Sequence, residues 1–414
     1  MSPPPPFHGW WVVAGTFAVL CTGFGIAYCF PAYFLTLQQE FGARRGDTSL
    51  VFSIAGALYF SLGILSGSIA DRFGPRAVVA GGMALVGLGT LLASQATSLW
   101  QIYLGYGVGV GVGIGFAYVP AVAAVQRWFL RQRGLATGIA VAGIGVGTAA
   151  GPPLAKLMID AWGWRAAYIG LGVAALVVAA FAFFTLLRSP EAYGQRPDGD
   201  AVAGGGAPPP VTGESLAEAM RSRPFWFLFT ACLLTSFGLF IPFVHLVPYA
   251  RDAGLTEGFG VTLIALLGVG STVGRFAFAG LAHRVGRRRA YAAMFVGIAA
   301  MQLLWAATTH PWLLAVFAIL FGAFYGGFVA MAPSVFADYY GTRALGSILG
   351  AQYSSVSLGV LFGPPVAGFV FDFFGSYVAT ILTGAALAVV GGLFVIATAD
   401  PATWRERRRT GDAR

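Results

Sequence analysis

The sequence predicts an all-α membrane protein of twelve transmembrane helices arranged as two six-helix halves. The first observation behind this prediction is composition: 57% of the residues are hydrophobic and 10% are charged, whereas soluble domains carry roughly 25% charged residues. The second is a series of apolar runs, each long enough to cross about 30 Å of hydrocarbon as a helix. The third is an internal repeat, because two local patterns recur about half a chain apart.

The internal repeat has two parts. Residues 67–76 (GSIADRFGPR) return 213 positions later as residues 280–289 (GLAHRVGRRR), and Gly151-Pro152-Pro153 returns 212 positions later as Gly363-Pro364-Pro365. A duplicated multi-span unit is typical of a transporter that moves two halves around a central site. We therefore expect four segments: an N-terminal half (1–188), a cytoplasmic linker (189–222), a C-terminal half (223–400) and a cytoplasmic basic tail (401–414).

The apolar runs fall into two sets of six. The first set covers residues 10–35, 48–70, 77–96, 99–126, 134–158 and 164–188. The second set covers residues 223–250, 258–281, 290–309, 311–337, 344–371 and 375–398. The fourth run has glycine at every second position from Gly105 to Gly115. Small residues at such spacing let helix backbones approach closely, so we expect this helix to pack tightly against a neighbour.

The arginines predict how these spans are oriented. Nineteen lie in alternate loops and tails, and only Arg44, Arg45, Arg165 and Arg251 lie on the opposite side. Loops rich in basic residues stay in the cytoplasm, so both termini are expected there. The preference for arginine over lysine and the lack of asparagine suggest a bacterium with GC-rich DNA, and hence a multi-pass protein of the bacterial inner membrane.

The loops predict no enzyme activity and no cofactor. They are short, and the one long stretch, 189–222, is rich in proline and glycine, as flexible linkers are. Within it, Glu214 to Arg223 predicts a short surface helix. The spans contain no cluster of metal ligands and no nucleophile triad. The net charge of +9 follows from the cytoplasmic loops, so the lipid bilayer is an expected partner and nucleic acid is not.

The repeated segments resemble the major facilitator superfamily. Residues 67–76 are similar to that superfamily's loop between the second and third spans, and the Gly-Pro-Pro motifs fit its hinge-forming fifth and eleventh helices. The resemblance implies the twelve-helix fold of that superfamily. It also implies that Asp71, Arg72 and Arg76 hold cytoplasmic helix ends together in one conformation and act in gating. The alternative is that these are solvated loop charges, because surface ion pairs are usually weak.

A narrower resemblance lies in the first and fifth spans. Residues 128–143 (WFLRQRGLATGIAVAG) are similar to the fifth-span signature of the monocarboxylate transporter family. Residues 8–13 (HGWWVV) and 28–31 (YCFP) resemble the first span of that family and of its relatives, the oxalate–formate exchangers. The resemblance implies a transported carboxylate without naming it.

Two basic residues lie inside the predicted spans, Arg275 and Lys156. Lys156 is near the outer end of its span and can extend its amine to the interface. Arg275 lies deep in the eighth span, where an arginine costs roughly 2.5–3.5 kcal/mol on insertion scales. Its fork of donors suits a carboxylate, so a substrate carboxylate is the simplest partner, and a bond to backbone carbonyls or a gate is the alternative. The matching position in the resembled family carries the anion-binding arginine.

Three further side chains are candidates for the substrate site. His245, inside the seventh span, can hydrogen-bond a substrate or carry a coupled proton, although a buried histidine can also be a packing residue whose hydrogen bonds are satisfied. Tyr118 and Tyr325 can each offer a hydroxyl and an apolar ring to a small organic acid. Aromatic residues in spans also serve as packing residues or interface anchors, so both interpretations stay open.

The chain departs from the resembled family at two positions and from the exchangers in one helix. Many animal members have aspartate four residues before the arginine and lysine after the proline of the first span, where this chain has Ser271 and Ala32. A coupled proton must therefore use His245, the substrate or another group. The oxalate exchangers need a second cation in the eleventh span, but residues 345–371 contain no lysine or arginine. Charge balance thus favours a monoanion.

Together these features predict a secondary transporter of small monocarboxylates such as lactate or pyruvate, with proton symport by alternating access. One alternative with the same fold is an organic-anion exchanger of the oxalate and formate type, and another is an exporter of larger apolar compounds. A sensor or membrane enzyme is the alternative from another class, and the short loops argue against it.

Overall fold

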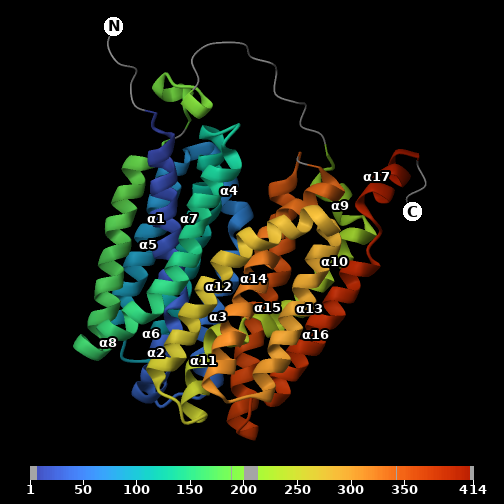
Figure 1. The fold of residues 1–414 in the computed structure, drawn as a ribbon. Coiled ribbons are helices and arrows are strands. Elements are labelled where there is room, and N and C mark those ends of the chain that lie inside the picture. The colour runs from blue at the N-terminus through green and yellow to red at the C-terminus, as the bar shows by residue number, and fades with distance from the viewer. Residues whose placement is uncertain (1–6, 188, 200–212, 342, 411–414) are drawn as a thin grey trace. The chain divides into compact units, whose positions relative to one another are not determined.

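The computed structural model describes residues 7–187, 189–199, 213–341 and 343–410, and the regular elements in these ranges are helices (Figure 1). The first part of the chain contains α1 (Gly9–Tyr28), α2 (Phe30–Phe41), α3 (Arg45–Ser61), α4 (Gly63–Phe73), α5 (Pro75–Ser94), α6 (Leu99–Ile102), the π-helical turn η1 (Tyr103–Val108), α7 (Gly109–Trp128) and α8 (Arg133–Thr185). The second part contains α9 (Leu216–Met220), α10 (Arg223–Leu239), α11 (Ile241–Asp252), α12 (Glu257–Val285), α13 (Arg287–Ala307), α14 (Pro311–Tyr340), α15 (Leu345–Phe374), α16 (Val378–Ala397) and α17 (Pro401–Thr410).

These helices provide the predicted membrane spans. Ten segments of the described chain are long and apolar enough to cross a membrane. One of them, α8, is a double span, because its 53 residues are interrupted at Gly163, whose φ of 81° ends one helix and starts the next. α3 and α4 follow each other end to end and together supply the remaining span. The all-α class and the twelve-helix membrane architecture are therefore confirmed.

The segment between the two sets of spans is partly described. Two short 3₁₀ turns, Glu191–Tyr193 and Pro197–Gly199, follow the first set. The expected surface helix is α9, whose first turn is closed by a reciprocal capping box between Ser215 and Glu218. The glycine- and proline-rich centre of the predicted linker, 204–210, lies outside the described residues.

Both repeats interrupt their first span at the same place. α1 gives way to α2 just before Pro31, and α10 gives way to α11 just before Pro242. Proline has no amide hydrogen and its ring crowds the carbonyl four residues earlier, so a helix bends or breaks there. The turn after each second span is also repeated, because Gly74 and Gly286 have φ angles of 85° and 86°. The duplicated sequence therefore folds into duplicated backbone geometry.

The helices pack as two compact units. Unit 1 comprises residues 1–29 and 62–208, and unit 2 comprises residues 30–61 and 209–414. The two units are defined by contacts between residues, whereas the two predicted halves are defined by the sequence repeat. Residues 30–61 belong to the first repeat but pack with the second, so α2 and α3 are parts of unit 2.

In unit 1, the glycine-rich fourth span packs against α5 at backbone distance. A Cβ atom added to Gly89 would lie 2.4 Å from the carbonyl oxygen of Gly105, and one added to Gly113 would lie 2.6 Å from that of Gly82. No larger residue fits at these positions without moving a backbone. The tight packing expected of this span is confirmed.

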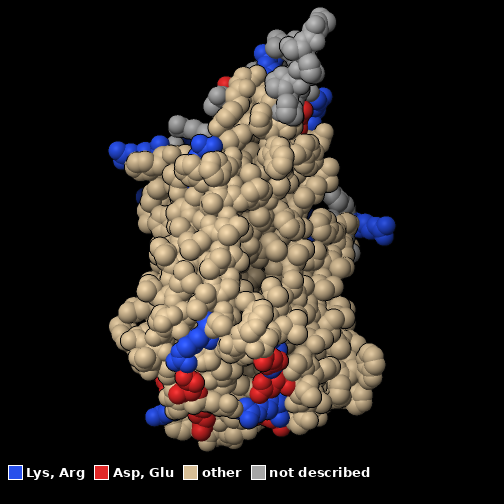
Figure 2. Space-filling view, turned by 90° about the vertical axis from the view of Figure 1, so that its left-hand side faces the viewer, with Lys and Arg blue, Asp and Glu red and all other residues tan. Residues whose placement is uncertain are grey.

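The surface fits a membrane environment. On the face shown in Figure 2, the middle carries almost no charged side chain, and acidic and basic side chains gather toward the lower end. Large apolar side chains such as Leu157, Phe184 and Leu393 are exposed on the helices. A soluble protein would not expose so many large apolar groups together, so the exposed surface of the spans faces lipid.

Candidate functional site

Unit 2 has two chemically different ends. α12 runs from Glu257 at one end to Val285 at the other, where the basic turn 286–289 follows. Basic loops mark the cytoplasmic side of a membrane protein. We therefore call the end of unit 2 at Glu257 the outer end, and the end at Arg287 the inner end.

Arg275 lies near the middle of the membrane-spanning part of α12. It is ten residues before α12 ends at Val285, which corresponds to about 15 Å along the helix axis. This is half of the roughly 30 Å of a hydrocarbon core. The side chain is half-buried. An arginine at this depth is costly unless protein, water or a ligand solvates it.

Tyr325 of α14 lies at the same level as Arg275, because α12 and α14 touch backbone to backbone. A Cβ atom added to Gly274 would lie 2.0 Å from the carbonyl oxygen of Ala323. Gly274 directly precedes Arg275, and Ala323 is two residues before Tyr325. Tyr325 is 5% exposed. The structure thus brings two of the predicted site residues to one level of one helix pair.

His245 lies on α11 but faces a different environment from Tyr325. The ring of Tyr325 packs against Phe243, with centroids 5.0 Å apart, and against Phe240 at 6.2 Å. Residues two apart on a helix point to different faces. Phe243 therefore connects α11 to Tyr325, while His245 faces Ser49, Pro364 and Tyr377.

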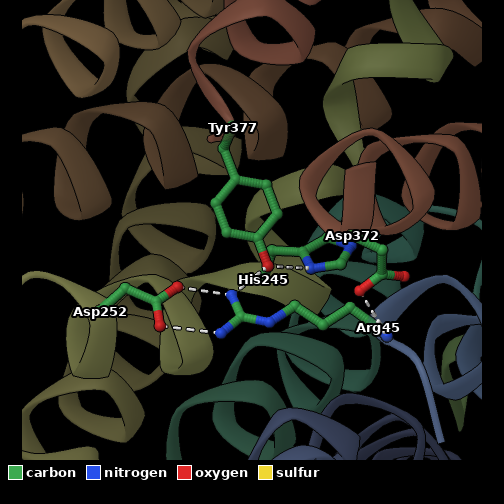
Figure 3. A network of polar contacts seen from close by, with 5 residues as sticks. All are labelled: Arg45, His245, Asp252, Asp372 and Tyr377. Atoms are coloured by element: carbon green, nitrogen blue, oxygen red, sulfur yellow. Dashed lines mark hydrogen bonds and ion pairs between the residues drawn. The ribbon is translucent and has the colours of Figure 1, made fainter. Parts of the chain in front are cut away.

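Both ring nitrogens of His245 are hydrogen-bonded, and its side chain is fully buried. Nε2 lies 2.9 Å from the carbonyl oxygen of Pro364 and 3.2 Å from the hydroxyl of Ser49. Nδ1 lies 3.0 Å from the hydroxyl of Tyr377 (Figure 3). A carbonyl oxygen can only accept, so the hydrogen-bond pattern assigns the proton to Nε2. In the neutral imidazole, Nδ1 then accepts from the Tyr377 hydroxyl.

Arg45, the first residue of α3, connects this histidine to an acidic group. Its guanidinium donates two hydrogen bonds to the carboxylate of Asp252, at 2.5 and 2.8 Å, and one to the hydroxyl of Tyr377 at 2.8 Å. Its central carbon lies 3.8 Å from the ring centroid of Phe371. The side chain of Arg45 is only 11% exposed. Such bidentate pairing and stacking is the geometry that arginine favours.

The backbone of Arg45 is held as firmly as its side chain. The carboxylate of Asp372, on α15, accepts from the N–H groups of Arg45 at 3.1 Å and Gly46 at 3.0 Å. These donors are in the first turn of α3, where a carboxylate is favoured. A Cβ atom on Gly368 would lie 2.6 Å from the Gly46 nitrogen. The start of α3 therefore rests directly on α15.

We call this set the outer network. It consists of Arg45, His245, Asp252, Asp372 and Tyr377 (Figure 3). Only His245 of these was singled out by the sequence, where Arg45 appeared as one of four arginines in the outer loops. The available signal was weak: a pair of arginines, Arg44 and Arg45, on the side that otherwise has few basic residues.

The remaining predicted residues lie in unit 1. Tyr118, on α7, is half-buried and its ring meets that of Phe24 edge to face at 5.5 Å. Arg72 is exposed in the last turn of α4 and lies over the neighbouring ring of Phe73 at 5.4 Å. Arg76 lies over the ring of Phe183 at 4.9 Å. The side chain of Asp71 lies outside the described residues, so its gating role stays a prediction.

The fold and the polar groups within it define a multi-pass membrane protein of two repeated helical halves, the architecture of secondary transporters. The chain matches the family model of the Major Facilitator Superfamily over residues 15–299 and 262–413. It therefore belongs to that superfamily and is a transporter. Among solved structures it is similar to a bacterial homologue of the human lysosomal transporter Spinster, with a TM-score of 0.68, 15% identity, and coverage of 100% of this chain and 99% of that one.

Curated relatives narrow the family. The chain is 31% identical to monocarboxylate transporter 12-B of Danio rerio over 410 residues, covering 93% of this chain and 86% of that protein. It is 32% identical to monocarboxylate transporter 12 of Rattus norvegicus, covering 92% and 83%, and 32% identical to monocarboxylate transporter 3 of the same organism, covering 95% and 81%. The chain belongs to the monocarboxylate transporter family, as its first and fifth spans suggested.

Proposed function

We propose that this transporter carries small monocarboxylates, such as lactate or pyruvate, together with a proton by alternating access of its two halves. The halves are residues 1–188 and 223–400, joined by the linker 189–222 and followed by the basic tail 401–414. The membrane is that of a bacterial cell, with both termini in the cytoplasm. The relatives are named for monocarboxylates, and this chain shares about a third of their sequence.

Arg275 is the observation that carries the proposal. It is a cation about 15 Å from the inner end of α12, at the same level as the buried Tyr325. A guanidinium in such a place binds a carboxylate strongly because water competes little there. We propose that Arg275 binds the substrate carboxylate and that Tyr325, Tyr118 and His245 contact the rest of the substrate.

The proton follows from the charge of the cargo. Moving an anion alone across the membrane costs about 2.3 kcal/mol per 100 mV of opposing potential. A proton moved with a monoanion removes this cost, since the pair is neutral. His245 is the candidate proton carrier, because Ser271 and Ala32 cannot bind a proton at physiological pH. On the cytoplasmic side, Asp71, Arg72 and Arg76 are proposed to act in gating.

The first test is uptake of labelled lactate into proteoliposomes, with and without an inwardly directed proton gradient. Wild type is compared with Arg275→Gln, which removes the charge and keeps a polar side chain. We expect the gradient to drive lactate accumulation in the wild type and Arg275→Gln to lower the uptake rate at least a hundredfold. A loss of this size corresponds to about 2.7 kcal/mol, the value of a charged hydrogen bond.

Arg284→Gln is the matched control, because Arg284 is exposed on the same helix near its inner end. It should leave uptake close to the wild-type rate. Uptake that depends on internal substrate and ignores the proton gradient would instead support anion exchange. Uptake that is indifferent to Arg275 would contradict the proposal and direct attention to export of larger apolar compounds.

A further inference from the structure

The outer network joins the two sequence repeats at one end of unit 2. Arg45 belongs to the first repeat, whereas its partners Asp252, Asp372 and Tyr377 belong to the second. Both the side chain and the backbone of Arg45 form hydrogen bonds to these partners. Any separation of α3 from α11 and α15 at this end must therefore break all of these bonds.

The contacts of Arg45 hold α3 strongly to the neighbouring helices at the outer end. A surface ion pair contributes little because water solvates both partners. Arg45 is different, since its guanidinium is 11% exposed, while Asp252 is 34% exposed at the outer rim. A nearly buried arginine that loses its carboxylate is left unpaired, which is costly, unless water enters at the same time. The Arg45–Asp252 pair therefore stabilises the closed arrangement of these helices, and water must solvate both charges when the pair separates.

Tyr377 links the hydrogen bonds of Arg45 to the protonation of His245. Its hydroxyl accepts from Arg45 at 2.8 Å and donates to Nδ1 of His245 at 3.0 Å. If Nδ1 gains a proton, it becomes a donor, and the hydroxyl must accept from two cationic donors at once. The imidazolium and the guanidinium would then share one oxygen in a poorly solvated place, where like charges repel strongly. Protonation of His245 and the bond from Arg45 to Tyr377 therefore oppose each other.

The other groups around His245 do not cancel this opposition. The guanidinium lies between Asp252 and the imidazole (Figure 3). The carboxylate of Asp372 instead accepts from the backbone N–H groups of Arg45 and Gly46, which satisfy both of its oxygens. Phe34 contributes an apolar ring that meets the imidazole edge to face, with centroids 5.5 Å apart. The titratable and charged groups linked to His245 by the contacts of this network are Arg45 of α3, Tyr249 and Asp252 of α11, Asp372 of α15, and Tyr377 before α16.

Water can reach the outer side of the network. A cavity of about 330 Å³ lies at the outer end of unit 2 and is lined by Tyr249, Asp252, Thr308, Phe371 and Tyr377, among others. Tyr377 borders this cavity and also contacts His245. A proton from outside therefore needs to pass only the Tyr377 hydroxyl to arrive at Nδ1.

We propose that the outer network is the outer gate of this transporter, and that Arg45 closes it only while His245 is neutral. This inference rests on the proposed proton-coupled transport. In the cycle, water outside supplies a proton to Nδ1, Arg45 releases Tyr377, and α3 separates from α11 and α15 so that the substrate can enter. Closure of Arg45 onto Tyr377 and Asp252 then requires the same proton to leave His245 toward the substrate site and the inside. The proton and the anion thus move in the same direction.

The test measures access to a buried reporter without any substrate. Ser53 is fully buried one turn beyond Ser49 on α3, and Ser53→Cys is placed in a protein whose three native cysteines are replaced by alanine. The labelling rate by a membrane-impermeant thiol reagent added outside is measured at about pH 5.5 and about pH 8, on either side of the ordinary histidine pKa. Because thiolate content itself changes with pH, each rate is divided by that of the exposed Thr309→Cys.

We expect the normalised rate in the reporter protein to be at least about fivefold higher at the acidic pH, since five- to tenfold corresponds to the net contribution of about one ordinary hydrogen bond. Arg45→Gln should raise the rate at both pH values to the acidic level or above. His245→Gln keeps hydrogen-bonding groups but does not titrate, so its rate should be low at both pH values. A rate that is unchanged by pH in the reporter protein, or unchanged by Arg45→Gln, would overturn the proposal.

The adjacent arginine supplies the matched control. Arg44 is exposed, and Arg44→Gln should label as the parent does at both pH values. Asp252→Asn is the second variant in case Arg45→Gln folds poorly, and it should also label fast at both. Lactate uptake is measured on the same preparations. If lactate is not transported but labelling follows pH as expected, the gate is supported and the assigned substrate is wrong; pH-independent labelling with intact proton-driven uptake contradicts the gate alone.

Discussion

The two repeats share a helix break but differ in the residue that follows it. Phe34 lies three residues after Pro31 in the first repeat, and His245 lies three residues after Pro242 in the second. The two rings touch edge to face, with centroids 5.5 Å apart. Equivalent backbone thus carries an apolar ring in one repeat and a ring that can bind a proton in the other. Both repeats therefore have the same backbone arrangement here, but only the second repeat has a titratable side chain at this position.

The second spans differ in the same way. Arg45 begins α3, and Glu257 begins α12. Glu257 pairs with Arg251 of its own repeat at 3.6 Å, and both side chains are well exposed, at 39% and 47%. Arg45 instead pairs with Asp252 of the other repeat and is nearly buried. The equivalent positions therefore hold a weak pair within one repeat and a strong pair between repeats.

The largest effect on transport is expected when His245 is replaced by phenylalanine, the residue type of its counterpart Phe34. His245→Phe removes the titratable group and keeps an aromatic ring, so net proton-driven lactate uptake should fall at least about tenfold, the effect of losing one charged hydrogen bond. Exchange of external for internal lactate, which needs no net proton movement, should keep most of its rate. Phe34→Leu serves as the control for packing at this contact. Equal losses in both assays would mean that His245 serves only binding or packing.

A smaller effect separates the two ion pairs. Arg45→Gln leaves the Asp252 carboxylate without its bidentate partner, and we expect a loss of about 1–3 kcal/mol in the free energy of unfolding. Arg251→Gln breaks the exposed pair and should change it by less than about 0.5 kcal/mol. Thermal unfolding of the detergent-solubilised variants measures both. Similar unfolding temperatures for the two variants would show that the contact between repeats is no stronger than the surface pair.

The smallest effect concerns the inner end of the fifth and eleventh spans. Before α8, Asp198 accepts from the backbone N–H groups of Leu130 at 2.9 Å and Arg131 at 2.8 Å. The equivalent helix α15 begins at Leu345 and is preceded by Ala344, which has no capping side chain. Slight burial raises the pKa of Asp198, but hydrogen bonds from Arg131, Leu130 and Gln132 outweigh it, and the net pKa lies below the ordinary value.

A folded-state pKa below the unfolded one means that Asp198 stabilises the fold above about pH 4, and that this contribution is lost as pH falls through the lowered pKa. Asp198→Asn should cost less than about 1 kcal/mol, because the carboxylate is largely solvated. Amide hydrogen exchange at residues 130–132 should be faster in the variant at neutral pH and should converge with the wild type in acid. Unchanged exchange at neutral pH would show that the cap does not order this turn.

Most of the fold could be predicted from sequence because each span is a local pattern. The apolar runs, Pro31, Pro242 and the repeated glycine turns act over a few residues, and the structure places helices where they indicate. Arg275 and Tyr325 could be proposed for the same reason, since a cation or a tyrosine within an apolar run is recognised from the run alone. The pairing of Arg45 with Asp252 could not, because it joins residues 207 positions apart. Only the packing of α3 on α15 turns an outer-loop arginine into a buried one.

The backbone contact between α12 and α14 has one more consequence. Where a carbonyl oxygen occupies the place of a missing side chain, as Ala323 does beside Gly274, the two helices have no soft layer of side chains through which to slide. They must move as a single rigid piece, whichever side of the membrane the site faces. Arg275 and Tyr325 would then keep a constant separation, and this separation would limit the size of the carboxylate that fits the proposed site.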